Sequence, residues 1–244
     1  MDFQKAFDTV PHRRLLLKLS SHGITGKMNR WIEAFLRERS QTVSVNGSIS
    51  NERKVTSGIP QGSVLGPLLF VIFINDLPVN ITSTIKMFAD DTKMYIRSDQ
   101  VNATNQLQED LYKLEEWSNN WLLKFHPQKC SVMKLGRTKT KADYYMTGIN
   151  SDKTTYNLKL KENEAEKDLG VVVNRHLNYK QHVTQCTSKA NKTIGIIRQT
   201  FRHLTNRTFV QLFKALVRPL LEYGHTVWQP QHKGLCSDLE DVQR

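Results

Sequence analysis

Two adjacent carboxylates stand between two short apolar runs near the middle of the chain. Asp90 and Asp91 are preceded by residues 85–88 and followed by residues 93–97, and both runs are predicted to be short strands. Because two neighbouring negative charges repel each other and are disfavoured within a strand, we expect them at a tight hairpin turn. Taken alone, this dipeptide is more simply interpreted as an Asp-rich turn than as a site for divalent metal ions.

The residues before this turn predict helices interrupted by one small hairpin. Pro11 and Gly23 bracket the first helix, since proline is favoured at a helix start and glycine just past its end. Asn46-Gly47 predicts a two-residue turn between strands at 42–45 and 48–55. Further helices are expected at about 27–39 and 63–76, and a Gly/Pro loop at 57–62 precedes the second of them.

The residues after the turn predict one more mixed region and then helices alone. A long helix is expected to have one apolar face, formed by Leu107, Leu111, Leu114 and Trp121. Trp117 and Trp121 are interpreted as core residues from their helical spacing, with stacking on bases as the alternative. Strands are expected at 131–135 and 169–173, a polar hairpin at 139–161, and helices at 179–203 and 205–222. We therefore predict an α+β fold with a boundary near Asn174.

The charge of the chain is strongly positive and unevenly placed. The formal net charge is +12, and no Asp or Glu occurs between Leu169 and Leu221. Such a balance favours a polyanionic partner such as nucleic acid, because like charges on one folded segment repel each other unless something neutralises them. The alternative is a solvated basic surface. The basic residues of this segment are Arg175, Lys180, Lys189, Lys192, Arg198, Arg202, Arg207, Lys214 and Arg218.

Cysteine usage and hydropathy exclude several classes of protein. The three cysteines, Cys130, Cys186 and Cys236, form no Cys-x-x-Cys pair, which disfavours a structural zinc site and fits a reducing compartment. The most apolar run, residues 64–74, is too short to cross a bilayer, and residues 1–14 lack the apolar core of a signal peptide. We expect an intracellular protein without a membrane partner, and both nucleus and cytoplasm are compatible with the sequence.

Three motifs in fixed order resemble those of a known enzyme family. The motifs are DFQKAFD at 2–8, SGIPQGSVLGPLLF at 57–70 and FADD at 88–91. Together they resemble the reverse transcriptase palm motifs of non-LTR retrotransposons, especially the jockey-like and CR1-like groups, over essentially the whole chain. The resemblance implies an α+β polymerase palm at 1–174, with an antiparallel sheet and packed helices, and a helical thumb or connection region at 175–244.

The resemblance also implies a two-metal site for RNA-templated DNA synthesis. Asp2 matches the first metal-binding aspartate of the family's motif A, and Asp90 and Asp91 match the pair in motif C. Two Mg²⁺ ions, with Mn²⁺ as a possible substitute, would lie about 3.5–4 Å apart and clamp the attacking and leaving oxygens. Because Asp2 directly follows Met1, we expect it to be loosely held.

Four other residues match positions that contact the nucleotide or its leaving group. Phe7 matches the aromatic gate that clashes with a 2′-OH, and Gln61 and Gly62 match the nucleotide-side contacts of motif B. Lys129 matches the motif D lysine, which protonates or neutralises the leaving pyrophosphate. The plainer alternatives are a core aromatic for Phe7, an ordinary turn for 57–62 and a surface charge for Lys129. Asp8 is expected to be structural.

The basic segment is implied to bind the substrate duplex. Residues 168–171 resemble the hairpin that holds the primer end, and the acid-free segment after them resembles the thumb. The residues expected to contact phosphates of the RNA template and DNA primer, without reading sequence, are Lys189, Lys192, Arg198 and Arg202. The other substrates would be deoxynucleotide triphosphates, and the oligomeric state is left open.

The resemblance predicts an RNA-directed DNA polymerase, with two alternatives of other classes. Only Met1 precedes motif A, so the fingers and the endonuclease of many relatives are expected to be missing, as in an N-terminally truncated copy. The alternatives are a catalytically inactive nucleic-acid-binding remnant and a domesticated scaffold that binds a protein partner.

Overall fold

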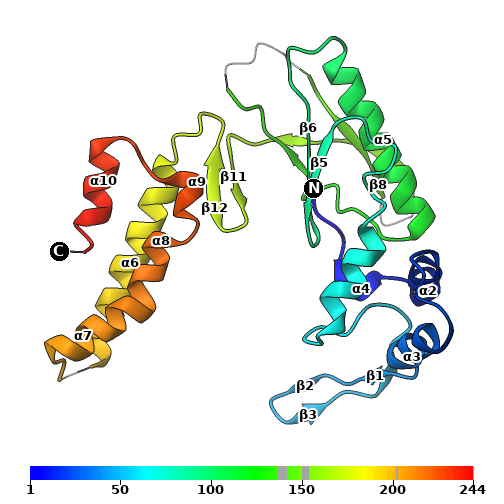
Figure 1. The fold of residues 1–244 in the computed structure, drawn as a ribbon, viewed down its shortest axis with the longest axis horizontal. Helices are drawn as coiled ribbons and strands as arrows, with labels where there is room; N and C mark the ends of the chain where they lie inside the picture. Colours follow the sequence, from blue (N-terminus) through cyan, green and yellow to red (C-terminus); the bar gives the residue numbers. More distant parts are fainter. Residues whose placement is uncertain (137–141, 150–153, 202, 244) are drawn as a thin grey trace. The chain divides into compact units, whose positions relative to one another are not determined.

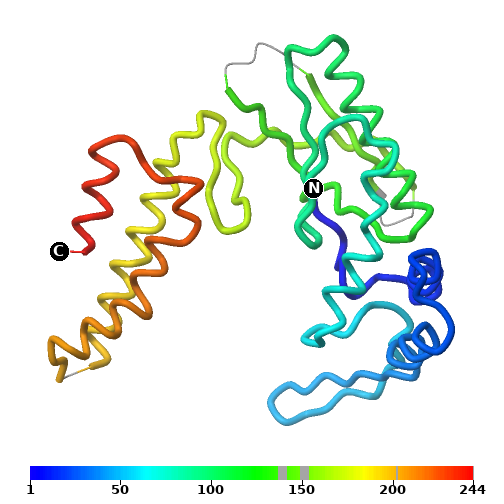
Figure 2. The backbone as a smooth tube through the Cα atoms, in the orientation of Figure 1, coloured from blue at the N-terminus to red at the C-terminus, as the bar shows by residue number. Residues whose placement is uncertain are grey.

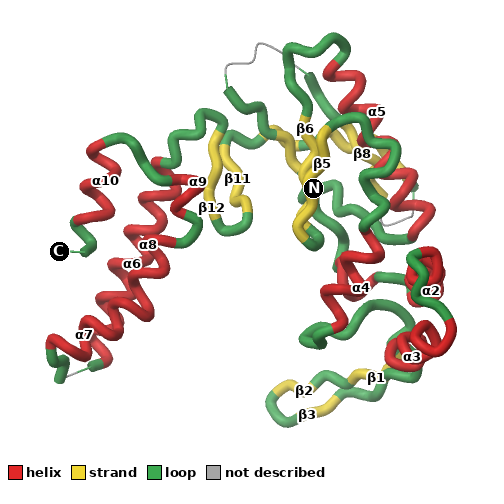
Figure 3. The backbone as a smooth tube through the Cα atoms, in the orientation of Figure 1, coloured by secondary structure: helices red, strands yellow, loops and turns green. Residues whose placement is uncertain are grey.

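The computed structural model describes residues 1–136, 142–149, 154–201 and 203–243, which form two compact units. Unit 1 comprises Met1–Val132 and Thr140–Lys161, and unit 2 comprises Met133–Lys139 and Glu162–Arg244. Both combine helices with small antiparallel strand pairs, as an α+β fold requires, and unit 2 is the more helical of the two (Figure 3). The division falls at Lys161 and Glu162, ahead of the boundary expected near Asn174.

Unit 1 contains five helices among its described residues (Figure 1). They are α1 (Ala6–Thr9), α2 (His12–Ser21), α3 (Gly26–Leu36), α4 (Leu65–Ile74) and α5 (Ala103–Trp121). The expected helices therefore form, each within a few residues of its predicted bounds. Helix α3 ends at Leu36, before the expected end at residue 39. The backbone of Arg37 is extended, although its N–H still bonds the carbonyl of Glu33.

The strands of unit 1 are short and pair as antiparallel ribbons. They are β1 (Ser40–Gln41), β2 (Ser44–Val45), β3 (Ser48–Ile49), β4 (Arg53–Lys54), β5 (Thr84–Phe88), β6 (Asp91–Tyr95), β7 (Ser131–Val132), β8 (Tyr145–Ile149) and β9 (Thr155–Lys159), with β10 (Lys161–Glu162) at the division between the units. Asn46-Gly47 forms the predicted two-residue turn, since Val45 pairs with Ser48 and both turn residues have positive φ. The expected polar hairpin is confirmed in β8 and β9, and its residues 139–141 and 150–153 lie outside the described residues.

The core of unit 1 gathers apolar side chains from its helices and from the start of the chain. Its most buried members include Phe3, Leu15, Leu19, Leu36, Phe70, Phe73, Leu114 and Leu123. Trp117 and Trp121 pack against this core, which confirms the interpretation made from their helical spacing. The rings of Phe73 and both tryptophans surround the ammonium of Lys18, the nearest ring centroid lying 3.7 Å from Nζ.

Lys18 is a buried cation with one carboxylate partner. Its Nζ donates to the carboxylate of Asp76 and to the carbonyl of Phe73, each at 2.5 Å. Burial lowers the pKa of Lys18 to about 8, although the hydrogen bond and charge of Asp76 oppose that shift. Trp117 Nε1 also donates to Asp76 at 3.0 Å. This network joins α2, the end of α4 and α5 behind the β5–β6 hairpin.

The described part of unit 2 contains one hairpin and a set of helices. The hairpin is β11 (Ala165–Asp168) and β12 (Val171–Asn174), and the helices are α6 (Lys180–Thr200), α7 (Asn206–Leu212), the π-helical segment η1 (Phe213–Val217), α8 (Arg218–Glu222), α9 (His225–Trp228) and α10 (Lys233–Glu240). The predicted strand at 169–173 is wrong at its start, because Leu169 and Gly170 form the turn between β11 and β12 with φ values of 42° and 90°. The single helix expected at 205–222 is divided by η1.

Two small apolar clusters hold unit 2 together. One contains Ala190, Ile197, Val217, Leu221 and Val242, and the other contains Val171, Val183 and Trp228. Among the residues that the structure describes, no helix is long and apolar enough to cross a membrane.

Candidate catalytic site and nucleic-acid interface

The turn between β5 and β6 is tighter than the sequence predicts. Phe88 pairs with Asp91, so the turn consists of Ala89 and Asp90 alone, and Ala89 takes a left-handed backbone with φ of 50°. Asp91 is therefore the first residue of β6 rather than part of the turn, and Thr92 is a buried strand residue. Asp90 is half-buried and Asp91 is exposed, so both carboxylates reach solvent at the tip of the hairpin.

The first residues of the chain pair with β6. The ammonium of Met1 donates to the carbonyl of Thr92 at 2.7 Å, and the N–H of Thr92 returns to the carbonyl of Met1 at 3.4 Å. This antiparallel register places Asp2 opposite Asp91. Because side chains alternate along a strand, the burial of Phe3 and Thr92 directs Asp2 and Asp91 to the other, solvent-facing side. The N-terminus beside the hairpin is visible in Figure 2.

The same segment is also held on its other side. The N–H of His126 donates to the carbonyl of Asp2 at 2.9 Å, and the N–H of Gln4 donates to the carbonyl of Lys124 at 2.8 Å. Phe3 forms a β-bridge with Phe125, and the two rings stack with centroids 4.5 Å apart. The expectation that Asp2 is loosely held is therefore wrong, because Met1 before it is bonded to β6 and its own carbonyl is bonded to His126.

Lys129 lies beside Asp2 although the two are far apart in the sequence. Its Nζ is 3.5 Å from Oδ2 of Asp2, and its N–H bonds the carbonyl of His126 in the turn that follows the Asp2 pairing. The Lys129 side chain is 62% exposed, so its ammonium remains open to solvent and to a substrate. The structure thus brings the predicted motif D lysine to the predicted motif A aspartate.

The three aspartates offer the donor chemistry that a hard divalent cation prefers. Asp2 and Asp91 share one face by register, and Asp90 lies in the adjoining turn. Ionised carboxylates are acceptors only and suit Mg²⁺ or Mn²⁺. Within the described ranges, no three His, Cys, Asp or Glu side chains already converge as a formed metal cage. The chemistry of these residues therefore fits such ions, and the ion pair with Lys129 now neutralises Asp2.

The loop at 57–62 packs directly on the motif A segment. The N–H of Ile59 donates to the carbonyl of Phe7, and the N–H of Gly58 donates to the carbonyl of Val10, both at 2.8 Å. A Cβ on Gly58 would lie 2.6 Å from the carbonyl oxygen of Asp8, so only glycine permits this approach. Gly62 has a positive φ of 79° but open space around its Cα, and its backbone is therefore free to approach a ligand.

Phe7 and Gln61 lie on either side of this contact. The ring of Phe7 stacks on Phe70 with centroids 4.5 Å apart, and the side chain is half-buried against the core of unit 1. Nε2 of Gln61 donates to Oδ1 of Asp8 at 3.0 Å. Sequence reasoning missed the close approach of Gly58 to Asp8 and the hydrogen bond from Gln61 to Asp8, although the first glycine in SGIPQG was a usable signal for a close backbone approach.

The basic residues of α6 do not all share one face. Lys189, Lys192 and Arg198 are exposed. At 100° per residue, Lys189 and Lys192 lie on the same side of the helix, whereas Arg198 lies on the opposite flank from Lys189. Arg202, the fourth residue predicted to contact phosphate, lies outside the described residues.

The β11–β12 hairpin is fixed to the helices of unit 2. Oη of Tyr223 donates to the carbonyl of Leu169 at 3.0 Å, and a Cβ on Gly170 would lie 2.9 Å from the Tyr223 ring. The N–H of Val172 donates to Nδ1 of the buried His182 at 3.2 Å. Sequence reasoning missed Tyr223 and His182, because each acts through a contact with a residue of another element, 54 and 10 positions away.

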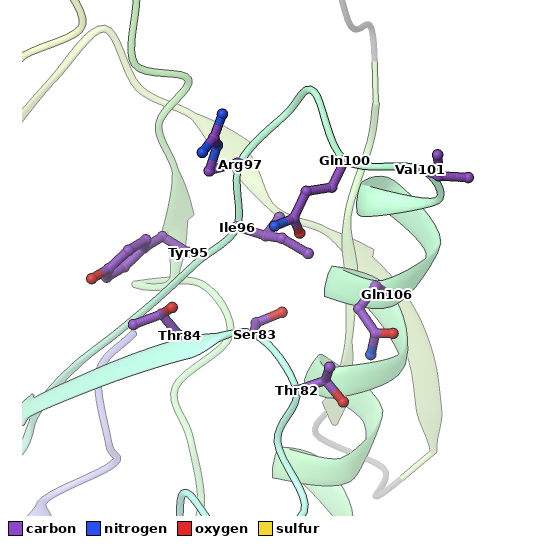
Figure 4. A pocket seen from close by; sticks show the side chains of 9 residues that line it. All are labelled: Thr82, Ser83, Thr84, Tyr95, Ile96, Arg97, Gln100, Val101 and Gln106. Atoms are coloured by element: carbon purple, nitrogen blue, oxygen red, sulfur yellow. The ribbon is translucent and has the colours of Figure 1, made fainter.

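One hollow of unit 1 lies away from the aspartates. It measures about 340 Å³ and lies beside the open ends of β5 and β6 and the start of α5 (Figure 4). Its lining residues are Thr82, Ser83, Thr84, Tyr95, Ile96, Arg97, Gln100, Val101 and Gln106. None of the predicted site residues lines it, so the candidate site is the open surface at the hairpin tip.

Comparison with known proteins bears directly on these motifs. Residues 1–187 match the family model described as reverse transcriptase (RNA-dependent DNA polymerase). The RNA-directed DNA polymerase from mobile element jockey of Drosophila melanogaster is 28% identical over all of this chain and 27% of its own length.

Two further relatives from flies agree with this match. The jockey enzyme of Drosophila funebris is 30% identical over 93% of this chain, and the probable RNA-directed DNA polymerase from transposon X-element of Drosophila melanogaster is 27% identical over 93%. The chain spans about a quarter of the length of these relatives. It belongs to the reverse transcriptase family, among the sequences of jockey and other non-LTR elements.

Proposed function

We propose that this chain carries out RNA-directed DNA synthesis by two-metal nucleotidyl transfer. The observation that supports this most is the pairing of Met1 with Thr92, which sets Asp2 opposite Asp91 on one exposed face, while Asp90 lies in the adjoining turn. The three carboxylates come from the two motifs that a polymerase of this family uses. Their exposure leaves room for a primer end and a nucleotide, which a buried acidic cluster would exclude.

Asp2, Asp90 and Asp91 would hold two divalent ions, Mg²⁺ or Mn²⁺. Bound there, the ions lower the pKa of the primer 3′-hydroxyl and neutralise charge on the triphosphate. The protein supplies the remaining steps. Lys129, beside Asp2, is placed to give its Nζ proton to the leaving pyrophosphate. The edge of Phe7 meets the sugar of the incoming deoxynucleotide and excludes a 2′-hydroxyl.

Unit 2 would bind the RNA template and DNA primer as the thumb, and unit 1 would be the palm. The exposed lysines of α6 and the absence of Asp and Glu from 169–221 support this assignment. The contacts of Tyr223 and His182 with β11 and β12 support counting this hairpin with the helices of the proposed thumb. We therefore place the start of the thumb at Glu162, before the primer-holding hairpin.

The test is primer extension by residues 1–244 on an RNA template with Mg²⁺, beside the Asp90→Asn variant. Loss of one carboxylate should reduce extension by at least about 10²-fold, because its charge stabilises the transition state through the metals. Binding of the RNA–DNA duplex should stay unchanged. Glu52→Gln, which removes an exposed carboxylate elsewhere in unit 1, is the control.

Two outcomes would count against the proposal. Extension that survives Asp90→Asn would show that this aspartate is not a metal ligand. Wild-type chain that binds the duplex but extends no primer with either Mg²⁺ or Mn²⁺ would instead favour a nucleic-acid-binding function without turnover.

A further inference from the structure

Asp8 holds both ends of the loop that follows β4. Oγ of Ser57 donates to the backbone carbonyl of Asp8 at 3.0 Å, and Nε2 of Gln61 donates to its carboxylate at 3.0 Å. Asp8, near the end of α1, therefore contacts the loop twice. Its backbone carbonyl bonds Ser57 at the start of the loop, and its carboxylate bonds Gln61 near the end. The first contact does not use the Asp8 side chain, so it remains available when that side chain is changed.

The middle of the loop is fixed independently. The carbonyl of Gly58 accepts hydrogen bonds from Nη2 of Arg39 at 2.9 Å and from Nε2 of His12 at 2.7 Å. Gly58 also lies against the backbone of Asp8, at a distance that no side chain would allow. These contacts hold the loop backbone without any help from the Gln61 side chain. The hydrogen bond between Asp8 and Gln61 therefore acts only on the Gln61 side chain.

The chemistry of the pair fixes which way the Gln61 amide points. An ionised carboxylate accepts hydrogen bonds and cannot donate them, so the amide nitrogen must face Asp8. The amide oxygen is attached to the same planar carbon on the opposite side, and both residues are exposed. Gln61 therefore presents an acceptor, Oε1, to whatever binds in front of the loop.

The nucleotide gate contacts the same loop. Phe7 directly precedes Asp8, its carbonyl accepts from the N–H of Ile59 at 2.8 Å, and its ring is stacked on Phe70. The ring of Phe7 and the amide of Gln61 are therefore positioned by one short segment. On an incoming deoxynucleotide, the one hydrogen-bond donor that is the same whichever of the four bases it carries is the sugar hydroxyl, because the base edges differ and are used in pairing.

We propose that Asp8 is a positioning residue, which orients Gln61 so that Oε1 accepts a hydrogen bond from the sugar hydroxyl of the incoming nucleotide. This inference rests on the polymerase function proposed above. Asp8 touches neither the nucleotide nor the metals, and it acts by preventing the amide from turning over. Asn at this position would allow either orientation, because its own amide both donates and accepts.

The contact itself is tested by NMR of the side-chain amides in the full chain, with the Gln61 signal assigned by its loss in Gln61→Met. In Asp8→Asn the Gln61 amide protons should shift toward the values of a free glutamine and exchange faster with water. Asp8→Glu keeps an acceptor and should restore part of the wild-type shift. Glu52→Gln, which removes the same charge, should leave the signal in place. An unchanged Gln61 signal in Asp8→Asn overturns the proposal.

The consequence for the nucleotide is tested in a complex with a chain-terminated primer on an RNA template. Dissociation constants are measured for a deoxynucleotide and for its 2′,3′-dideoxy analogue, which lacks the sugar hydroxyl. Asp8→Asn should reduce the preference for the deoxynucleotide by about threefold to tenfold, the usual effect of one hydrogen bond. Asp8→Glu should recover part of it, and Glu52→Gln should keep it.

The two experiments separate this inference from the function on which it rests. If the wild-type chain binds the duplex but no nucleotide, the polymerase function is overturned, and so is the proposed hydrogen bond from Gln61 to the sugar hydroxyl. The NMR signal of the Gln61 amide still decides whether Asp8 orients Gln61. Nucleotide binding with an unaltered preference in Asp8→Asn overturns the positioning role alone.

Discussion

Asp2 is held through its backbone carbonyl, and its carboxylate forms an ion pair with Lys129. The carbonyl of Asp2 accepts from His126, while its side chain, 38% exposed, meets the lysine ammonium at 3.5 Å. An ion pair so exposed contributes little to stability. Its importance lies instead in competition, since a divalent cation and the ammonium would both neutralise the same oxygen.

Removing that competitor should strengthen metal binding. In Lys129→Gln we expect the affinity for Mn²⁺ to rise about twofold to fivefold, the range that an exposed ion pair supports. The measurement is the fraction of free Mn²⁺ by electron paramagnetic resonance, and Asp2→Asn should weaken binding in the same assay. Lys124→Gln is the matched control. This substitution also removes one positive charge, but Lys124 donates to the amide oxygen of Asn119 and not to a carboxylate. Equal gains in both lysine variants would mean a general charge effect, without competition at Asp2.

At the scale of elements, α6 has three distinct sides. His182, Val183, Cys186, Ala190 and Ile197 face the interior of unit 2. Lys189 and Lys192 lie along one exposed side, and Arg198 lies on the far flank. A duplex that contacts the lysine side would therefore leave Arg198 largely unused, even though all three residues are exposed and basic.

The salt dependence of binding should separate these sides. For the double variant Lys189→Gln/Lys192→Gln, the slope of log affinity against log salt on an RNA–DNA hybrid should shrink by about 1.8, since each phosphate contact contributes about 0.9. Arg198→Gln alone should change the slope by much less than the value of about 0.9 that one phosphate contact contributes. The slopes are obtained by fluorescence anisotropy between low and high salt. A slope loss from Arg198→Gln as large as that from the double variant would place the duplex on the other flank.

The same elements show what the sequence can and cannot predict. Local signals were sufficient for α2, for the Asn46-Gly47 turn and for α5, because capping residues, turn residues and apolar spacing act over a few positions. They were insufficient for Asp91, whose place in β6 depends on its partner Phe88, and for the Leu169-Gly170 turn, which depends on Tyr223. The pairing of Asp2 with β6 joins residues about ninety positions apart and follows from no local pattern.

At the scale of the whole molecule, each unit has its own core, and each contains a buried group that responds to acid. In unit 1, Asp110 is fully buried and accepts from the N–H groups of Thr82 and Ser83 and from Lys113. Burial raises the pKa of Asp110, but the hydrogen bonds from Ser83, Lys113 and Thr82 together lower it, to about 2. In unit 2, burial lowers the pKa of His182, and the charge of Lys189 lowers it further.

Acid should therefore loosen the two units at different pH. The pKa of His182 is below its ordinary 6.5 in the folded state, so the unfolded chain binds the proton first and unit 2 loses stability as the pH falls below about 6.5. Asp110 contributes stability that is present above its ordinary pKa of 3.8 and is lost as the pH falls toward 2. We expect β12 and the start of α6 to lose protection first, and α5 with residues 82–83 later.

Hydrogen exchange by mass spectrometry, corrected for intrinsic rates at each pH, resolves the two steps by peptide. His182→Asn retains an acceptor for the N–H of Val172 but does not titrate, and it should remove the step near pH 6. Asp110→Asn should remove the step below pH 4 and should lower the stability of unit 1 at neutral pH by about 2 kcal/mol. Simultaneous loss of protection in both units at one pH would contradict this account.

The contacts of Tyr223 and His182 with the β11–β12 hairpin have a mechanical consequence. The tip at Leu169-Gly170 is bonded to the residue after α8, and β12 is bonded to the first turn of α6, a rod about 30 Å long. The two hydrogen bonds therefore couple the hairpin to the helices at both its tip and its second strand. A movement of α6 would be passed to the hairpin tip through these two hydrogen bonds.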